Sequence, residues 1–183
     1  MFLDIGLGIL IAIWVSHFFG VPLTTGLLGF GVFFSLIPDI DFLVELFKHG
    51  SVGGKFVREH RELLHFPILY APLILCVYLI FGSMWALMLG FGLLGHFLHD
   101  SVGIGWGVKW LWPISKRSFK FFSERNGAFS RRLLVSWSPQ ELPGVVAEHG
   151  DPHWMRNIYL RLHPIGVIEF LFFVGALIML YFY

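Results

Sequence analysis

Residues 84–100 read MWALMLGFGLLGHFLHD, an apolar run that ends in ionisable side chains. The part from 84 to 98 approaches the length of about 20 residues that a transmembrane helix needs. Its glycines, Gly90, Gly92 and Gly95, are the small residues that let helices pack closely in a membrane. This stretch therefore predicts a membrane helix in a tightly packed bundle, with polar groups at its end.

Four further apolar stretches occupy residues 5–19, 21–37, 66–81 and 164–183, and Gly26, Gly29 and Gly31 interrupt the second of them. Hydrophobic residues make up 56% of the 183-residue chain and charged residues 14%, whereas a soluble domain carries about 25% charged residues. Such a chain has too little polar surface for a soluble globule and too much hydrophobicity for disorder. We expect one all-α, polytopic membrane domain over residues 1–183, a bundle of about five transmembrane helices. The single Cys76 excludes an intrachain disulfide and a cysteine-based zinc site.

All 13 Lys and Arg residues fall in two connections, the one after residue 37 and the one after residue 98. Cytoplasmic loops are the ones enriched in Lys and Arg. We therefore expect an inner-membrane, multi-pass protein with both long connections and the N-terminus in the cytoplasm and the C-terminus outside. The first apolar stretch has no preceding positive segment and no small-residue cleavage site, so it is expected to be a retained helix.

The larger connection, residues 101–163, is expected to be a basic cytoplasmic loop region between helices four and five. Basic residues alternate with phenylalanines there: Lys116, Arg117, Lys120, Arg131 and Arg132 with Phe119, Phe121, Phe122 and Phe129. This alternation suits the anionic inner leaflet of a bilayer, and an ordinary solvated cytoplasmic loop explains it equally well. The net charge of +1 indicates no polyanionic partner, so the expected partner is the lipid bilayer and not a nucleic acid.

Ionisable residues gather at the ends of three apolar stretches. Asp39 and Asp41 follow the second stretch, His60 and His65 precede the third, and the fourth closes with His96, His99 and Asp100. In the predicted topology all three clusters reach the same cytoplasmic face. The sequence therefore predicts that residues distant along the chain converge on one site.

His96 lies about one turn inside an apolar stretch, where ionisable residues are rare and usually functional. Asp100, four residues later, shares its helix face. Imidazole and carboxylate groups bind zinc and, with more oxygens, manganese or magnesium. The clusters offer more ligands than one tetrahedral ion needs, so we expect a divalent metal, zinc before manganese or magnesium, and room for two ions. Such ions polarise a substrate oxygen and generate hydroxide. The ligand candidates are Asp39, Asp41, His60, His65, His96 and Asp100.

Two neighbours of these ligands are candidates for catalysis, and each has a simpler alternative. Glu62 stands between two histidines and could transfer a proton, or it could pair with Arg58 or Arg61 on a loop surface. Arg61 could bind a phosphate or carboxylate of the substrate in a bidentate manner, or contact lipid headgroups. The pair of aspartates could likewise be an interfacial helix cap, and the sequence leaves open whether His99 is a ligand.

The three motifs Pro38-Asp39-Ile40-Asp41, His60-Arg61-Glu62-Leu63-Leu64-His65 and His96 to Asp100, followed by Gly103 to Pro113, resemble the predicted membrane-bound metal-dependent hydrolases, also called the YdjM-like family. The similarity covers roughly residues 20 to 115, and the order and spacing of the motifs make it fairly specific. It implies metal binding by the six candidate ligands. The chain departs from the family pattern at Glu62, where glycine is usual, and at Phe66, where serine is common.

We therefore predict a membrane-bound metal-dependent hydrolase that acts on an ester or phosphoester at the cytoplasmic membrane face. An amphiphile such as a phospholipid would be a suitable substrate. One alternative is a metal or proton-coupled transporter in which His96, Asp100 and the intramembrane Glu169 form a relay. A second alternative is a structural or regulatory membrane protein in which a metal only ties the loops together.

Overall fold

The computed structural model describes residues 1–40, 47, 64–103, 105–125, 128–129, 132–149, 151 and 153–183. The chain divides into two compact units. Unit 1 comprises Met1–Pro38, Leu69–His96 and Ile168–Tyr183, and unit 2 comprises Asp39–Ile68 and Phe97–Val167. The boundary at residues 96 and 97 falls inside one continuous helix.

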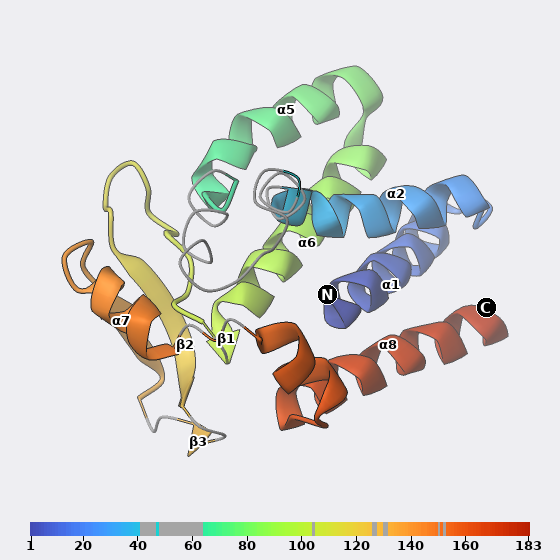
Figure 1. Ribbon diagram of the computed structural model, residues 1–183. Helices are drawn as coiled ribbons and strands as arrows, with labels where there is room; N and C mark the ends of the chain where they lie inside the picture. Colours follow the sequence, from blue (N-terminus) through green and yellow to red (C-terminus); the bar gives the residue numbers. More distant parts are fainter. Residues whose placement is uncertain are drawn as a thin grey trace. The chain divides into compact units, whose positions relative to one another are not determined.

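Five helices correspond to the five predicted apolar stretches, and most of their residues belong to unit 1 (Figure 1). They are α1 (Phe2–Phe19), α2 (Thr25–Leu36), α5 (Tyr70–Phe81), α6 (Ser83–Asp100) and α8 (Pro164–Phe182). The start of α2 is fixed by an N-cap, since the backbone N–H of Leu27 donates to Thr24 Oγ1 at 3.1 Å. A 3-10 turn, η1 (Ile37–Asp39), follows α2, and another, η3 (Pro67–Leu69), precedes α5. The prediction of a mainly helical chain is confirmed.

Two helices in the described part of the chain, α1 and α8, are long and apolar enough to cross a membrane. Helices α2 and α5 are apolar but short. A helix of 12 residues spans about 18 Å at 1.5 Å per residue, which is less than the roughly 30 Å of a bilayer core. Two candidate spans are by themselves weak evidence for a membrane protein, and the arrangement with five spans stays a prediction.

Glycines allow close approach of the helices within unit 1. A Cβ atom added to Gly8 on α1 would lie 2.5 Å from Val32 Cα and 2.6 Å from Gly31 O on α2. One added to Gly92 on α6 would lie 3.0 Å from the Ser35 nitrogen. The predicted role of glycine in close packing is thus confirmed for Gly31 and Gly92. The core that these contacts enclose consists of Ile11, Ala12, Val15, Leu27 and Met88.

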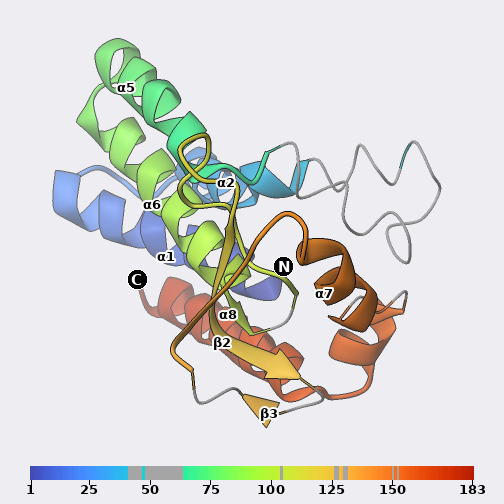
Figure 2. The same cartoon turned by 90° about the vertical axis from the view of Figure 1, so that its left-hand side faces the viewer.

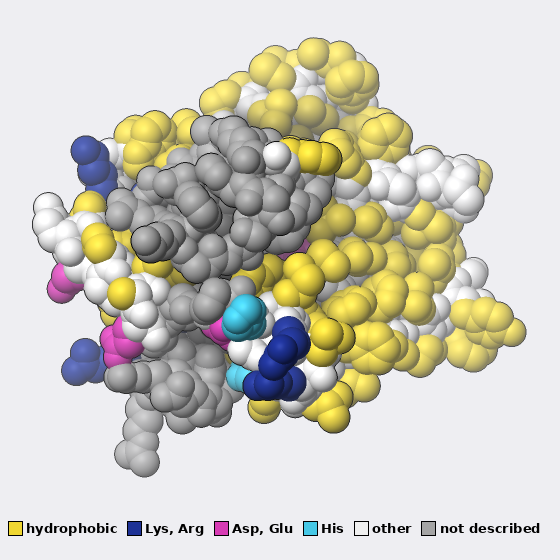
Figure 3. Space-filling view, in the orientation of Figure 1, with side chains coloured by type: hydrophobic (Ala, Val, Ile, Leu, Met, Phe, Trp, Pro, Cys, Tyr) yellow, Lys and Arg dark blue, Asp and Glu magenta, His cyan; other side chains and the backbone are white. Residues whose placement is uncertain are grey.

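The outer surface of unit 1 is strongly apolar. Figure 3 shows hydrophobic side chains covering most of the visible surface of its helices. Large apolar side chains stand fully outward, such as Leu79 and Ile80, each 71% exposed, and Phe182, 80% exposed. Water-soluble monomers rarely expose contiguous patches of this kind, so this surface fits a lipid environment.

Unit 2 contains a small β-sheet, which the sequence analysis did not predict. Its strands are β1 (Val102–Gly103), β2 (Ser118–Arg125), β3 (Ala128–Phe129) and β4 (Leu134–Trp137), and β2 pairs parallel with β1 and antiparallel with β3 and β4 (Figure 2). The helix α7 (Leu142–His149) and a π-helical turn, η4 (Arg156–Leu160), follow. The expectation of an entirely helical chain is therefore wrong for part of residues 101–163.

The alternation of basic and aromatic residues in β2 has a structural cause. Successive side chains of a strand point to opposite faces, and on β2 the face of Ser118 and Lys120 is buried, with Lys120 fully so. Lys120 is in register with Val135 of β4. Lys120 is thus not available to lipid headgroups, contrary to the expectation for this stretch, whereas Lys116 and Arg117 are exposed.

Candidate metal centre

The last two turns of α6 carry the ionisable residues that the sequence singled out. His96 is 1% exposed, and Asp100, one turn later, is the last residue of the helix. Side-chain hydrogen bonds fix the helix end: Ser101 Oγ donates to Phe97 O at 2.6 Å and accepts from Trp110 Nε1 at 2.8 Å. Because the helix is continuous through this turn, it sets the spacing of His96, His99 and Asp100.

Within unit 2, His65 and Asp100 form a close pair. His65 Nε2 lies 3.0 Å from Asp100 Oδ2, and the side chains are 2% and 11% exposed. The ring of Phe97 meets the His65 ring edge-on, with centroids 6.3 Å apart. The next residue, Phe66, packs on Trp112 with ring centroids 4.8 Å apart. His65 stands two residues before η3, and the contact with Phe97 holds its ring against the end of α6.

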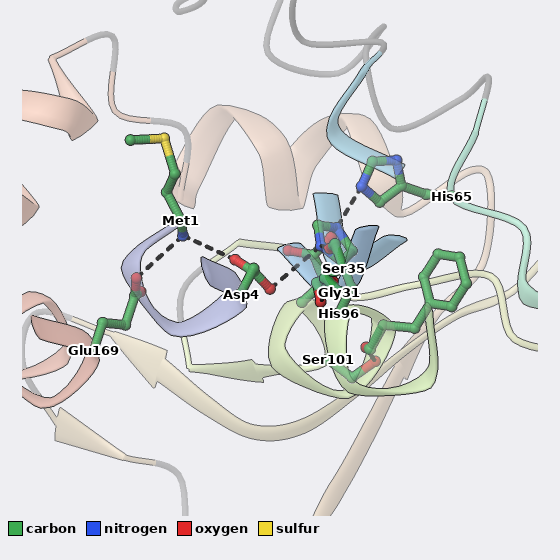
Figure 4. A network of polar contacts seen from close by, with 10 residues as sticks. Met1, Asp4, Gly31, Ser35, His65, His96, Ser101 and Glu169 are labelled. Atoms are coloured by element: carbon green, nitrogen blue, oxygen red, sulfur yellow. Dashed lines mark hydrogen bonds and ion pairs between the residues drawn. The ribbon is translucent and has the colours of Figure 1, made fainter. Parts of the chain in front are cut away.

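Within unit 1, His96 faces two oxygen atoms. Its Nδ1 lies 2.9 Å from the backbone oxygen of Ser35 and 3.3 Å from Asp4 Oδ1. Asp4 comes from the first turn of α1 and is 1% exposed. Figure 4 shows Asp4 between the imidazole of His96 and the amino group of Met1, which also contacts Glu169.

Three of the predicted ligands could hold a metal ion. Asp39, His65 and His96 each offer one ligand atom, and these atoms lie within 4.8 Å of one another. Asp39, the last residue of η1, is half-buried, and both histidines are buried. Two imidazoles and a carboxylate form a donor set that divalent ions such as zinc accept in proteins. The residues therefore fit a divalent metal.

The other predicted site residues have different outcomes. Asp100 contacts His65 and is not a member of the group of three, so its role as a direct ligand stays a prediction. His99 is half-buried at the end of α6. The residues Asp41, His60, Arg61 and Glu62 lie outside the described part of the chain, and their predicted roles remain predictions.

Asp4 and Lys120 are two buried polar residues whose burial was not predicted from the sequence. Asp4 had a sequence signal, because an acidic residue at the start of an apolar helix is unusual and often functional. The sequence signal for Lys120 was weaker: it is the alternation with period two that is typical of a strand.

The sequence model of the YdjM inner membrane protein family matches residues 4–183, nearly the whole chain. No curated protein and no solved structure matches the chain. The family match extends the similarity of the three motifs to both units, and it supports a location in the inner membrane. The chain belongs to the YdjM inner membrane protein family.

Proposed function

We propose that the protein is a membrane-bound, metal-dependent hydrolase that cleaves an ester or phosphoester at the cytoplasmic face of the membrane. The observation that carries the proposal is the grouping of ligand atoms from Asp39, His65 and His96 within 4.8 Å. Family membership supports the membrane setting.

Asp39, His65 and His96 would hold the metal, with zinc favoured by two imidazole ligands. We also propose a second ion, with Asp41 and His60 among its ligands, and the support for this ion is the sequence motifs that contain these residues. A bound divalent ion supplies a Lewis acid that polarises a carbonyl or phosphoryl oxygen and lowers the pKa of water. Manganese or magnesium would be favoured if carboxylate oxygens dominate the set.

The chain's own residues have separate tasks in this proposal. Asp100, 3.0 Å from His65 Nε2, orients that imidazole, as carboxylates do for ligating histidines. Glu62 transfers a proton, since it stands between two ligands in the sequence. Arg61 binds an anionic group of the substrate through its planar guanidinium.

An amphiphilic substrate, such as a phospholipid, suits the position of the ligands in the chain. Asp39 follows the apolar helix α2, His65 precedes α5, and His96 lies one turn before the end of α6. Residues at the ends of apolar helices lie at headgroup level if these helices enter the bilayer. A scissile bond near a headgroup would then reach the site while its acyl chains stay in the lipid.

The proposal is tested with purified protein in lipid nanodiscs, loaded with Zn²⁺ or Mn²⁺ and offered a panel of phosphoesters and lipid esters. Asp39→Asn keeps the side-chain size and removes an anionic ligand, so turnover of the cleaved substrate should be lost. The control is Asp151→Asn, another acid of unit 2, whose Oδ2 accepts a hydrogen bond from Asn157 at 2.6 Å. The control should keep wild-type turnover, and both variants should melt like the wild type at saturating metal.

One observation favours a transporter as the second candidate. Asp4 and Glu169 are buried carboxylates on apolar helices, 1% and 4% exposed, and such residues often mark ion or proton paths. If the metal-loaded wild type cleaves nothing in the panel while His96→Ala abolishes ion flux into liposomes, the transporter should replace the hydrolase. If metal removal changes only the melting temperature, the structural role holds.

A further inference from the structure

We infer that Asp4 is a positioning residue for His96, which selects the imidazole tautomer that leaves Nε2 free of a proton to bind metal. The inference rests on the proposed metal centre, because it assigns a role to a residue that would act on the metal only through His96. Asp4 lies 92 positions before His96 in the sequence, on a different helix.

The contacts at His96 Nδ1 determine where the proton resides. The backbone oxygen of Ser35, at 2.9 Å, can only accept a hydrogen bond, and an ionised carboxylate such as Asp4, at 3.3 Å, also only accepts. Nδ1 must therefore carry the hydrogen that faces these two oxygens. In a neutral imidazole the lone pair is then on Nε2, and a lone pair is what a metal ligand needs.

The oxygen of Ser35 is available for this contact because of its place in α2. The last four carbonyl groups of an α-helix have no partner within the helix, and α2 ends at Leu36. Gly92 allows the backbones of α2 and α6 to approach at this level, since a Cβ there would lie 3.0 Å from the Ser35 nitrogen. The close approach of α2 and α6 at Gly92 thus brings Ser35 and His96 together within unit 1.

Asp4 is a buried acidic residue on an otherwise apolar helix. Burial of a carboxylate that is 1% exposed is unfavourable unless close polar partners compensate for the lost hydration. Its oxygens are divided between the imidazole and the amino group of Met1, at 3.3 and 3.0 Å. A carboxylate on the second nitrogen of a ligating histidine fixes the ring and raises its basicity. This role explains the burial of an acid on an otherwise apolar helix.

A matched control comes from the same unit. Glu169 on α8 is a second buried carboxylate, and its Oε2 lies 3.2 Å from the amino group of Met1. Glu169→Gln and Asp4→Asn both remove one negative charge from unit 1 and keep the side-chain size. Only Asp4→Asn changes a group at the His96 imidazole, so a difference between the variants measures that contact and not the charge of the unit.

The experiment uses the full chain in detergent micelles with ¹⁵N-labelled histidine. Long-range ¹H–¹⁵N spectra of the metal-free protein report which ring nitrogen is protonated, and His96→Gln identifies the signal. The wild type should show a protonated Nδ1 and a bare Nε2 at His96. Chelator competition then gives the Zn²⁺ affinity, which should fall about 10 to 100-fold in Asp4→Asn, recover in part in Asp4→Glu and stay unchanged in Glu169→Gln.

The inference and the proposed function fail in different ways. A wild type that binds no Zn²⁺ overturns the proposed function. A wild-type His96 protonated at Nε2 overturns the inference whatever the metal does, and so does an Asp4→Asn protein that binds Zn²⁺ as tightly as the wild type. If Asp4→Asn does not fold, the test rests on the tautomer of His96 in the wild type and on the Zn²⁺ affinity of Asp4→Glu. A protonated Nε2 in the wild type then still overturns the inference.

Discussion

At the scale of single residues, both buried histidines have an oxygen partner on one ring nitrogen. His65 faces Asp100 within unit 2, and His96 faces Asp4 and Ser35 within unit 1. A buried imidazole is tolerated when its N–H donates to such a partner, and the other nitrogen is then available as an acceptor or ligand. The same contact leaves the second nitrogen of each ring as a candidate metal ligand.

Lys120 is a further buried polar residue, and its replacement should destabilise the folded protein. Its side chain is fully buried on β2, whereas Lys116 nearby is exposed. A buried ammonium group is stable only with compensating partners, and removing one member of a buried pair costs about 3 to 5 kcal/mol. Lys120→Met should therefore lower the melting temperature by several degrees, and Lys116→Met should not. Equal melting temperatures in a thermal unfolding assay would contradict this view of Lys120.

The residues that the sequence could predict are those that stand in short motifs. Asp39, His65 and His96 were predicted from their clusters at the ends of apolar stretches, and the structure brings their ligand atoms together. Asp4 could not be assigned to His96, because no spacing rule connects residues on different helices. Its partner depends on how α1, α2 and α6 pack, which single-sequence patterns do not determine.

At the scale of elements, the approach of α6 to α2 should control the geometry at His96. A Cβ on Gly92 would crowd backbone atoms of Phe34 and Ser35 at 3.0 Å, while one on Gly90 would find only Ile74 at 3.9 Å. Overpacking of this kind costs about 1 to 3 kcal/mol, and alanine at an open helical position gains up to about 1 kcal/mol over glycine.

Gly92→Ala should therefore melt at a lower temperature than the wild type and bind Zn²⁺ more weakly, because the Ser35 oxygen moves away from His96. Gly90→Ala, on the same helix, should be neutral or stabilising and keep the wild-type affinity. Thermal melting and chelator competition check both variants. The expectation is wrong if the two substitutions behave alike.

The stability of the first turn of α7 should depend on pH. Ser138 N–H donates to Glu141 Oε2 at 2.7 Å, and Glu141 N–H donates to Ser138 Oγ at 3.3 Å, the reciprocal pattern of a capping box. The backbone hydrogen bond from Ser138, followed by the contact with its side chain, holds the pKa of Glu141 below the usual value of 4.5.

Because the pKa of Glu141 is lowered in the folded state, its contribution to stability is present above pH 4.5 and is lost as the pH falls through the lower value. Hydrogen-exchange protection of α7, corrected for intrinsic rates, should therefore decrease between neutral pH and pH 3. Glu141→Gln should remove most of this dependence. The same decrease in the variant and the wild type would show that another group is responsible.

The helices were predictable and the sheet was not, for physical reasons. Apolar stretches that approach a bilayer width indicate helices almost by themselves, since a lipid environment demands internal hydrogen bonds. In β2, basic and aromatic residues alternate, and both a strand face and a membrane-surface loop explain that pattern. The burial of Ser118 and Lys120 depends on pairing with β4 and on packing in unit 2, which the sequence does not reveal.

At the scale of the whole molecule, the distribution of charge predicts the orientation in the membrane. All 13 Lys and Arg residues lie in the two long connections, which the positive-inside rule places in the cytoplasm. A reporter inserted near Asn126 should therefore read as cytoplasmic, and one fused after Tyr183 should read as outside. Reporters on the same side would contradict the five-span arrangement.

The central claim is that Asp39, His65 and His96 hold a metal ion, and metal content measured on purified protein tests it most directly. The wild type, Asp39→Asn, His65→Ala, His96→Ala and His153→Ala are prepared in parallel, and bound metal per chain is determined by mass spectrometry. His153 is exposed and serves as the matched control. The account predicts at least one divalent ion per chain in the wild type and His153→Ala, with marked loss in the three site variants. Equal metal content in all five proteins, or none in a wild type loaded with Zn²⁺ or Mn²⁺, would contradict it.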